Sequence, residues 1–197
     1  MDKGGPAHGG LAFSCTCGQL TGHISDRGVR LGTHVECFCH DCRAAQLYFG
    51  QPDPAPGPVD IFQMAPDEIE IDSGEQFLSA MKLSPKGMLR WYASCCNAPL
   101  ATTPPKPNLP FAGFIADRIT GDVSALGPIT TRGFVPQPNS KQKHEKVRFA
   151  VFGLLRRALG SRLSGRWKNT PFFDHETGKA TVTPNVISKD ERAALYP

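Results

Sequence analysis

The positions of the cysteines constrain this chain more than any other feature. All seven lie in three short clusters, Cys15–Cys17, Cys37–Cys42 and Cys95–Cys96. An odd number of cysteines cannot all pair as disulfides within one chain. Clustered thiols are typical of metal ligands, because short loops can bring two soft thiolate sulfurs around one tetrahedral ion. The sequence therefore predicts metal binding, with zinc as the expected metal.

Seven thiolates divide most simply into one group of four and one of three. Closed structural zinc sites have four protein ligands, whereas reactive sites have three and keep a position open for water or substrate. The compact C-x-C-x-x-C group would form the open site: Cys37, Cys39 and Cys42. The remaining cysteines would form the closed site: Cys15, Cys17, Cys95 and Cys96. We expect one or two zinc ions per chain.

The fourth ligand of the closed site stays open at this point. Neighbouring side chains on extended backbone point to opposite faces, so Cys95 and Cys96 reach one ion together only where the chain bends sharply. Asn97 tolerates the left-handed conformation that such a turn requires. We favour Cys96 as the ligand. A three-sulfur site completed by water, or no site at all, is the alternative.

Composition indicates a small β protein. Among 197 residues, 20 are glycine and 18 are proline, which favours short strands joined by long loops. The proline-rich run 50–60 reads as a loop, and 61–64, 68–71 and 87–96 read as strands. No apolar stretch reaches the ~18 residues of a membrane span. We expect a mainly β fold without a membrane span, in the cytoplasm, where thiols stay reduced.

The chain changes character at Asn139. We divide it into a flexible N-terminus (1–10), a zinc-binding β domain (11–138) and a basic helical extension packed on it (139–197). From Lys141 to Lys168 there are nine basic residues and one acidic residue, a net charge of +8. Apolar residues recur there at helical spacing: Val147, Val151, Leu154, Leu155 and Ala158. A capping box formed by Ser188 and Glu191 predicts a short terminal helix.

Two interpretations of the basic helix are open. In the first, it docks on the β domain by its apolar side and leaves its arginines in solvent. In the second, the extension contacts a partner, either nucleic acid phosphates or an anionic membrane surface. We favour docking and do not expect nucleic acid to be bound. The sequence does not indicate the oligomeric state.

Three motifs give the chain a resemblance to a known family. C-T-C-G at Cys15–Gly18, C-F-C-H-D-C-R at Cys37–Arg43 and C-N-A-P-L at Cys96–Leu100 occur in the family's order and spacing. Over residues 11–115 the chain resembles the glutathione-dependent formaldehyde-activating enzymes, which include the centromere protein V type. It departs from them at Phe38, His40, Ala93 and Asn97, where the family has histidine, serine, cysteine and glycine. The Ala93 departure removes one of the family's structural ligands.

The resemblance implies a β-tent fold with a structural zinc on the outer clusters and a reactive zinc on the middle one. It also implies a carbon-sulfur lyase-like activity, the addition of glutathione to formaldehyde. We expect Cys39, the middle thiolate, to lie nearest the reacting centre. A purely ligating role for Cys39 is the alternative. His40 and Asp41 would carry protons or orient ligands, or would simply be exposed. Arg43 would attract an anionic substrate, or would be an ordinary surface arginine. Whether the chain is an enzyme at all stays open, since a zinc-stabilised scaffold without activity also fits.

Overall fold

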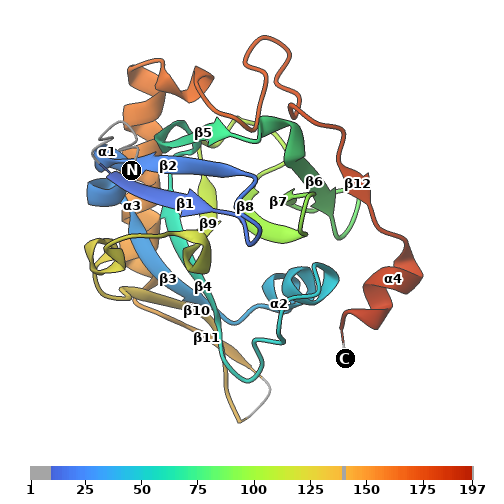
Figure 1. Ribbon diagram of the computed structural model, residues 1–197. Helices are drawn as coiled ribbons and strands as arrows, with labels where there is room; N and C mark the ends of the chain where they lie inside the picture. The colour runs from blue at the N-terminus through green and yellow to red at the C-terminus, as the bar shows by residue number, and fades with distance from the viewer. Residues whose placement is uncertain (1–9, 139–140, 197) are drawn as a thin grey trace, which may run out of the picture.

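Short strands form most of the regular structure in the computed structural model, which describes residues 10–138 and 141–196 (Figure 1). The strands are Gly10–Ser14 (β1), Thr21–Ser25 (β2), Thr33–Cys37 (β3), Val59–Met64 (β4), Ile69–Ser73 (β5), Leu78–Lys82 (β6), Leu89–Ala93 (β7), Ala98–Thr103 (β8), Ala112–Ile115 (β9), Thr131–Pro136 (β10), Gln142–Glu145 (β11) and Asn185–Val186 (β12). The α-helices are Asp26–Leu31 (α1), His40–Tyr48 (α2), Val147–Leu163 (α3) and Lys189–Ala194 (α4). Five short 3-10 helices lie in the connections: Pro66–Glu68, Glu75–Phe77, Ala116–Arg118, Val123–Leu126 and Arg166–Lys168.

The strands form two sheets. A three-stranded sheet has the order β1-β2-β5, and a nine-stranded sheet has the order β11-β10-β3-β4-β9-β8-β7-β6-β12. Pairing is antiparallel except where β10 joins β3 and β12 joins β6, both in parallel. The predicted mainly β fold of short strands with a C-terminal helical extension is therefore confirmed.

The main core joins the two sheets. Phe13 of β1, Phe62 of β4, Trp91 of β7 and Phe114 of β9 are at most 2% exposed, and Phe13 and Phe114 lie with ring centroids 4.8 Å apart. Phe172, from the C-terminal extension, stacks on Trp91 at 4.8 Å. As a result, segments from both sides of residue 138 share one core and one sheet. The division of the chain into domains at 10 and 138 stays a prediction, and the flexibility expected for 1–10 concerns residues of which only Gly10 is described.

Helix α3 confirms the expected helix but not its packing. Its buried residues are Gly153, Arg157 and Ser161. Val147, Val151 and Leu155, which we expected to face the β domain, are 46–60% exposed. The expectation of apolar docking with solvated arginines is therefore wrong. The physical reason is a set of polar groups on the β domain that only the polar side of the helix can satisfy.

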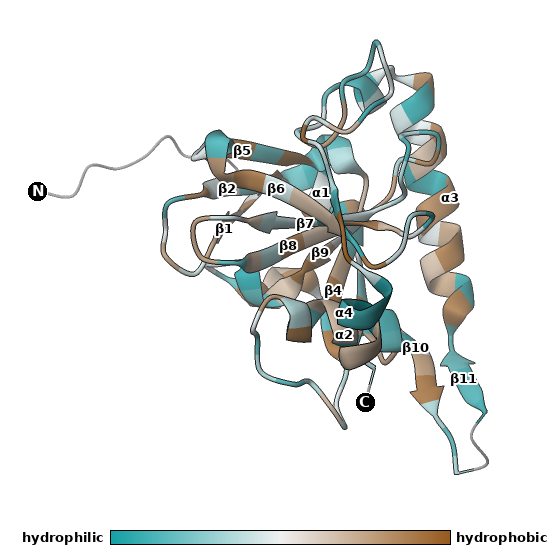
Figure 2. Cartoon of the chain, turned by 90° about the vertical axis from the view of Figure 1, so that its right-hand side faces the viewer, coloured by the Kyte–Doolittle hydropathy of each residue, from teal (hydrophilic) through white to brown (hydrophobic). Residues whose placement is uncertain are grey.

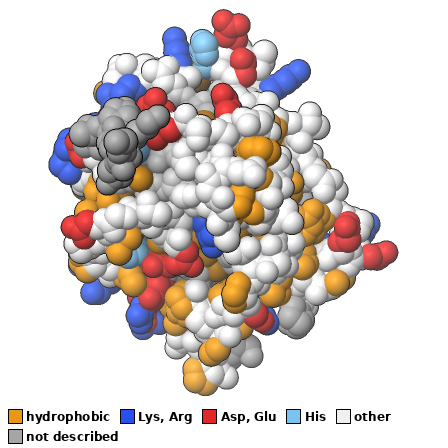
Figure 3. Space-filling view, viewed as in Figure 1, with side chains coloured by type: hydrophobic (Ala, Val, Ile, Leu, Met, Phe, Trp, Pro, Cys, Tyr) orange, Lys and Arg blue, Asp and Glu red, His pale blue; other side chains and the backbone are white. Residues whose placement is uncertain are grey.

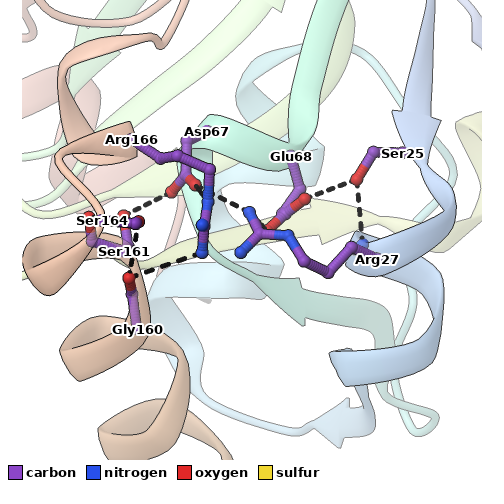
Figure 4. Close-up of polar contacts among 9 residues, drawn as sticks. Ser25, Arg27, Asp67, Glu68, Gly160, Ser161, Ser164 and Arg166 are labelled. Atoms are coloured by element: carbon purple, nitrogen blue, oxygen red, sulfur yellow. Dashed lines mark hydrogen bonds and ion pairs between the residues drawn. The ribbon is translucent and has the colours of Figure 1, made fainter.

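Figure 4 shows part of this polar interface, with Asp67 at its centre. The Asp67 carboxylate, whose side chain is 1% exposed, accepts hydrogen bonds from Ser161 Oγ at 2.6 Å and from Arg166 Nε at 3.3 Å. Arg27, which follows the start of α1, donates to Asp67 at 3.1 Å and also pairs with Glu68. Further along the helix, Arg157 Nη1 donates to Leu31 O at 2.8 Å and to Thr33 Oγ1 at 2.7 Å. Charge-assisted hydrogen bonds, which are stronger than neutral ones, thus hold α3 in place.

The terminal helix matches its prediction in detail. Ser188 Oγ accepts from the Glu191 backbone N–H at 3.1 Å, and Glu191 accepts from the Ser188 N–H at 2.8 Å. Among the described residues, we find no helix with the length and apolar character needed to cross a bilayer.

Candidate metal centres

The first cysteine group begins in the turn between β1 and β2. Cys15 is 3% exposed, and its sulfur accepts a hydrogen bond from the Leu20 backbone N–H at 3.3 Å. Two backbone bonds close the turn, from Cys15 N to Leu20 O at 2.9 Å and from Gly18 N to Cys15 O at 3.1 Å. Gly18 has φ = 76°, a left-handed conformation that glycine adopts without steric cost. The turn directs both Cys15 and Cys17 toward the turn between β7 and β8.

That second turn resolves the question of Cys95 and Cys96. The chain leaves β7 at Ala93 and bends at once, with Cys96 N donating to Ala93 O at 3.3 Å. Asn97 adopts φ = 52°, the left-handed conformation that the sequence led us to expect it to tolerate. Because the backbone is not extended here, the two adjacent thiols lie on the same side, and both join the group.

The sulfur spacing of the four-cysteine group fits a tetrahedral zinc ion. The Sγ–Sγ distances are 3.6 Å for Cys15–Cys17, 3.8 Å for Cys15–Cys95, 3.4 Å for Cys17–Cys95 and 3.9 Å for Cys95–Cys96. Four sulfurs at about 2.3 Å from one tetrahedral ion would lie about 3.8 Å apart. A disulfide would instead need about 2.05 Å. The donor set and its spacing therefore suit a closed zinc site.

The environment of Cys15 favours its charged form. Burial raises the pKa of this thiol, but the Leu20 N–H and the neighbouring thiols of Cys17, Cys96 and Cys95 outweigh burial and lower the pKa to about 6. Burial and its contacts with Cys17 and Cys15 raise the pKa of Cys95. Since a thiolate is the form that binds metal, this environment favours the ligating form of Cys15.

The second group lies where β3 passes into α2. Cys37 ends β3, Cys39 is the N-cap of α2, and Cys42 lies in the first turn of that helix. The Cys39 sulfur accepts from the Cys42 backbone N–H at 3.3 Å, so the helix start itself orients a ligand. The three sulfurs lie within 4.8 Å of one another. The C-x-C-x-x-C spacing thus forms one compact three-thiol group.

Cys42 is the buried member of this group and faces a cation. Arg90 of β7, which is 8% exposed, donates to Cys42 Sγ at 3.7 Å and to Thr102 Oγ1 at 3.0 Å. Contacts with Cys37 and Cys39, together with the Arg90 guanidinium, hold the pKa of Cys42 well below its usual value. Contacts with Cys39 and Cys42, together with burial, raise the pKa of Cys37. The contact with Cys37 lowers the pKa of Cys39, but Cys42 and burial raise it to about 11.

A hollow of about 160 Å³ opens on the other side of the group. Cys37, Cys39, His40 and Arg43 line it together with the loop 54–57, whereas Cys42 does not. An ion held by the three sulfurs would therefore have its remaining position toward this hollow. This is the arrangement that an open zinc site requires.

The other predicted site residues have defined places. His40 is exposed and lies at the rim of the hollow, while Asp41 accepts a hydrogen bond from the Tyr196 hydroxyl. Arg43 forms two hydrogen bonds with Asp53, at 2.8 and 2.7 Å, and this pairing lowers the pKa of Asp53 to about 2. Since Asp53 already holds the Arg43 guanidinium, the arginine has less capacity for an anionic substrate than its position suggests.

Comparison with known proteins gives a family without an established activity. A family described as "Family of unknown function (DUF6151)" matches residues 9–179. The chain belongs to the DUF6151 family. No curated protein matches it. A solved structure of a Rhodobacter sphaeroides protein, a structural genomics target, is 15% identical, covers 60% of this chain and 96% of its own, and has a TM-score of 0.41.

Two arginine contacts beside the cysteine groups of this DUF6151 protein were not predicted from the sequence. Arg90 meets Cys42 only because the pairing of β7 in the sheet brings it beneath α2, which no local motif encodes. Arg118 links the turn that carries Cys15 and Cys17 to the segment that follows α2. It donates to Thr16 Oγ1 at 2.7 Å and to Gln51 Oε1 at 3.3 Å. Neither arginine lies near its partner in sequence, so the sequence contained no signal for these contacts.

His23 lies outside both cysteine groups of this DUF6151 protein. His23 lies 2.8 Å from Asp72 and 3.6 Å from Glu70, and the three form a further group of metal-capable side chains. Both carboxylates are exposed, and such groups are common on surfaces without an ion. We assign no site to them.

Proposed function

We propose that this chain is a zinc protein with a closed four-sulfur site and an open three-sulfur site. The observation that carries the proposal is the spacing of the sulfurs of Cys15, Cys17, Cys95 and Cys96. Four of the six Sγ–Sγ distances are 3.4–3.9 Å, close to the ~3.8 Å of tetrahedral zinc, and all four sulfurs lie within 4.8 Å of one another. The hollow on one side of the three-sulfur group supports a reactive role for that site. Seven free thiols fit a reducing compartment, so we place the protein in the cytoplasm.

We further propose a carbon-sulfur bond-forming reaction at the open site, based on the resemblance to the glutathione-dependent formaldehyde-activating enzymes. The sulfur of glutathione adds to the carbonyl carbon of formaldehyde, a C–S bond forms, and the thiol proton ends on the former carbonyl oxygen. A bound zinc can hold a substrate thiol as thiolate or polarise an aldehyde oxygen. No oxidant or reductant is needed.

The residues around the hollow have separate roles in this proposal. Cys37, Cys39 and Cys42 hold the ion, and Cys39 lies nearest the reacting groups as both helix cap and ligand. Arg90 fixes Cys42 from the buried side. His40, at the rim of the hollow, moves the proton from the thiol sulfur to the product oxygen.

Exchange spectroscopy by NMR tests the reaction. The zinc-loaded protein should accelerate exchange between formaldehyde and its glutathione adduct, with saturation in both substrates. Because positioned acid-base groups contribute about 10²–10⁴-fold, His40→Gln should slow this exchange by at least about 10²-fold with zinc retained. His175→Gln, which changes an exposed histidine outside both centres, is the matched control. Exchange at the spontaneous rate, with two zinc ions bound, would refute the reaction but leave the sites intact.

The alternative is a non-catalytic binding module in which zinc only stabilises the fold. One observation favours it specifically, the large apolar surface that α3 leaves exposed. Under this alternative the open site binds zinc without accelerating the exchange, and the partner binds at the C-terminal extension.

A further inference from the structure

Helix α3 is turned with its apolar side outward. Seven of its apolar side chains are 46–80% exposed: Val147, Phe149, Val151, Phe152, Leu155, Leu159 and Leu163. Five of them recur at every fourth position and so form one continuous row along the helix. We call these seven residues the outer face of α3. Figure 2 shows α3 along one edge of the molecule, where the brown segments of the helix mark its apolar residues.

The outward orientation is enforced by the opposite side of the helix. A Cβ at Gly153 would lie 2.7 Å from Thr33 Oγ1, so the helix approaches β3 too closely for a larger residue. Arg157 and Ser161 are 4% and 1% exposed and hold the polar contacts already described. The outer face is therefore not free to rotate inward and cover itself.

Exposure of this size is unusual for a surface helix. A helix on a globular protein normally buries its apolar stripe, and contiguous exposed apolar patches mark interaction sites. On the face of the molecule shown in Figure 3, by contrast, hydrophobic side chains lie in small separate groups. The seven residues of the outer face thus need a partner with an apolar interior.

The charges around the outer face identify the partner. The helix Val147–Leu163 contains no acidic residue. Arg148 and Arg156 are exposed, and within residues 10–138 and 141–196 neither has an acidic partner. In Figure 2 the β10–β11 hairpin continues along the same edge. Lys143 of that hairpin pairs with Glu145 at 3.9 Å, so Arg148 and Arg156 are the cations that remain for a partner. The partner should therefore be apolar inside and negatively charged outside.

We propose that the outer face of α3 binds the surface of an anionic lipid bilayer. Apolar side chains would enter the boundary between headgroups and acyl chains, while Arg148 and Arg156 would meet lipid phosphates and carboxylates. A second copy of the chain fits less well, because a symmetric pairing would bring the same cations together without an acid on either helix. Nucleic acid phosphates would contact Arg148 and Arg156, but the apolar row would stay exposed to water. The inference concerns a surface separate from both cysteine groups and does not rest on the proposed reaction.

Flotation with lipid vesicles tests this proposal on the full zinc-loaded chain. The protein should bind phosphatidylcholine vesicles that contain phosphatidylserine, and bind pure phosphatidylcholine much more weakly. The triple variant F152S/L155S/L163S should lose about tenfold or more of this binding, since apolar contacts drive interfacial insertion. The variant R148Q/R156Q should lose about thirtyfold on the anionic vesicles, the factor for two cations near such a surface. V123S/V186S, which changes two exposed valines elsewhere, is the matched control.

Zinc content and circular dichroism would establish that every variant is folded. Vesicle binding that survives in the triple variant, or no binding by the wild-type chain at low salt, would overturn the proposal. So would a wild-type dimer that the triple variant abolishes in the absence of vesicle binding, because the face would then be an interface between copies. Binding to RNA but not to vesicles would overturn it as well.

Discussion

Replacing Arg90 with methionine tests whether this buried arginine supports metal binding at the three-cysteine group. Methionine keeps much of the apolar stem but removes the guanidinium that donates to Cys42 Sγ at 3.7 Å. A hydrogen bond to a charged group contributes about 1.5–3 kcal/mol. Loss of a partner that orients a metal ligand typically lowers affinity by about 10–100-fold, which corresponds to about 1.4–2.8 kcal/mol. The hydrogen-bond energy and the expected loss of zinc affinity therefore give similar free-energy ranges.

Competition with a chromophoric chelator measures this effect. In the Arg90→Met variant, one zinc per chain should be released at a chelator concentration about 10–100-fold lower than in the wild-type chain. The zinc of the four-sulfur group should be unaffected. Thr102→Val removes the other partner of Arg90, at 3.0 Å, and is the control for a general packing defect. Unchanged zinc affinity in a folded Arg90→Met protein would refute the role assigned to this residue.

Other predictions concern the fold that carries the sites. Asp67→Ala should lower the free energy of unfolding by about 3–5 kcal/mol, since it leaves buried donors without their carboxylate. Asp190→Ala, at an exposed position, should lower it by at most about 1 kcal/mol. Urea denaturation measures both values, and equal effects would contradict the role of Asp67. Asn97→Val should lower the free energy of unfolding by about 1–3 kcal/mol, because a β-branched residue is strained at φ = 52°. Asn97→Gly should leave the stability nearly unchanged. A valine variant as stable as the wild-type chain would show that the turn is not constrained. Gly153→Val should detach α3 from Thr33 and raise proteolysis near the helix, and protection equal to wild type would argue against this packing.

Local signals predicted much of the fold and of the candidate site. The cysteine spacing predicted the compact group of Cys37, Cys39 and Cys42 because short loops limit where nearby sulfurs can go. Asn97 marked a left-handed turn because few residues other than glycine adopt that conformation at low energetic cost. The capping box of Ser188 and Glu191 marked a helix start because both of its hydrogen bonds lie within one turn. Each of these inferences needed only a few neighbouring residues.

The features that sequence reasoning missed depend on distant contacts. Helical spacing identified α3, but periodicity only shows that a helix has two unlike sides. Which side is buried was decided by Asp67 and Thr33, which lie about a hundred positions away in the chain and accept from Ser161 and Arg157. Arg90 and Cys42 meet for the same reason, through the pairing of strands. The preference for Cys96 over Cys95 assumed extended backbone, and the turn after Ala93 removed that assumption.

Metal analysis of protein purified without a metal-affinity tag tests the central claim most directly. We predict two zinc ions per wild-type chain. Cys39→Ser should retain one of them, because the group of Cys15, Cys17, Cys95 and Cys96 is untouched. Cys17→Ser should instead weaken zinc binding at the four-cysteine group. A wild-type chain without zinc, or a Cys39→Ser chain that still holds two zinc ions as tightly as wild type, would contradict the assignment of the two sites.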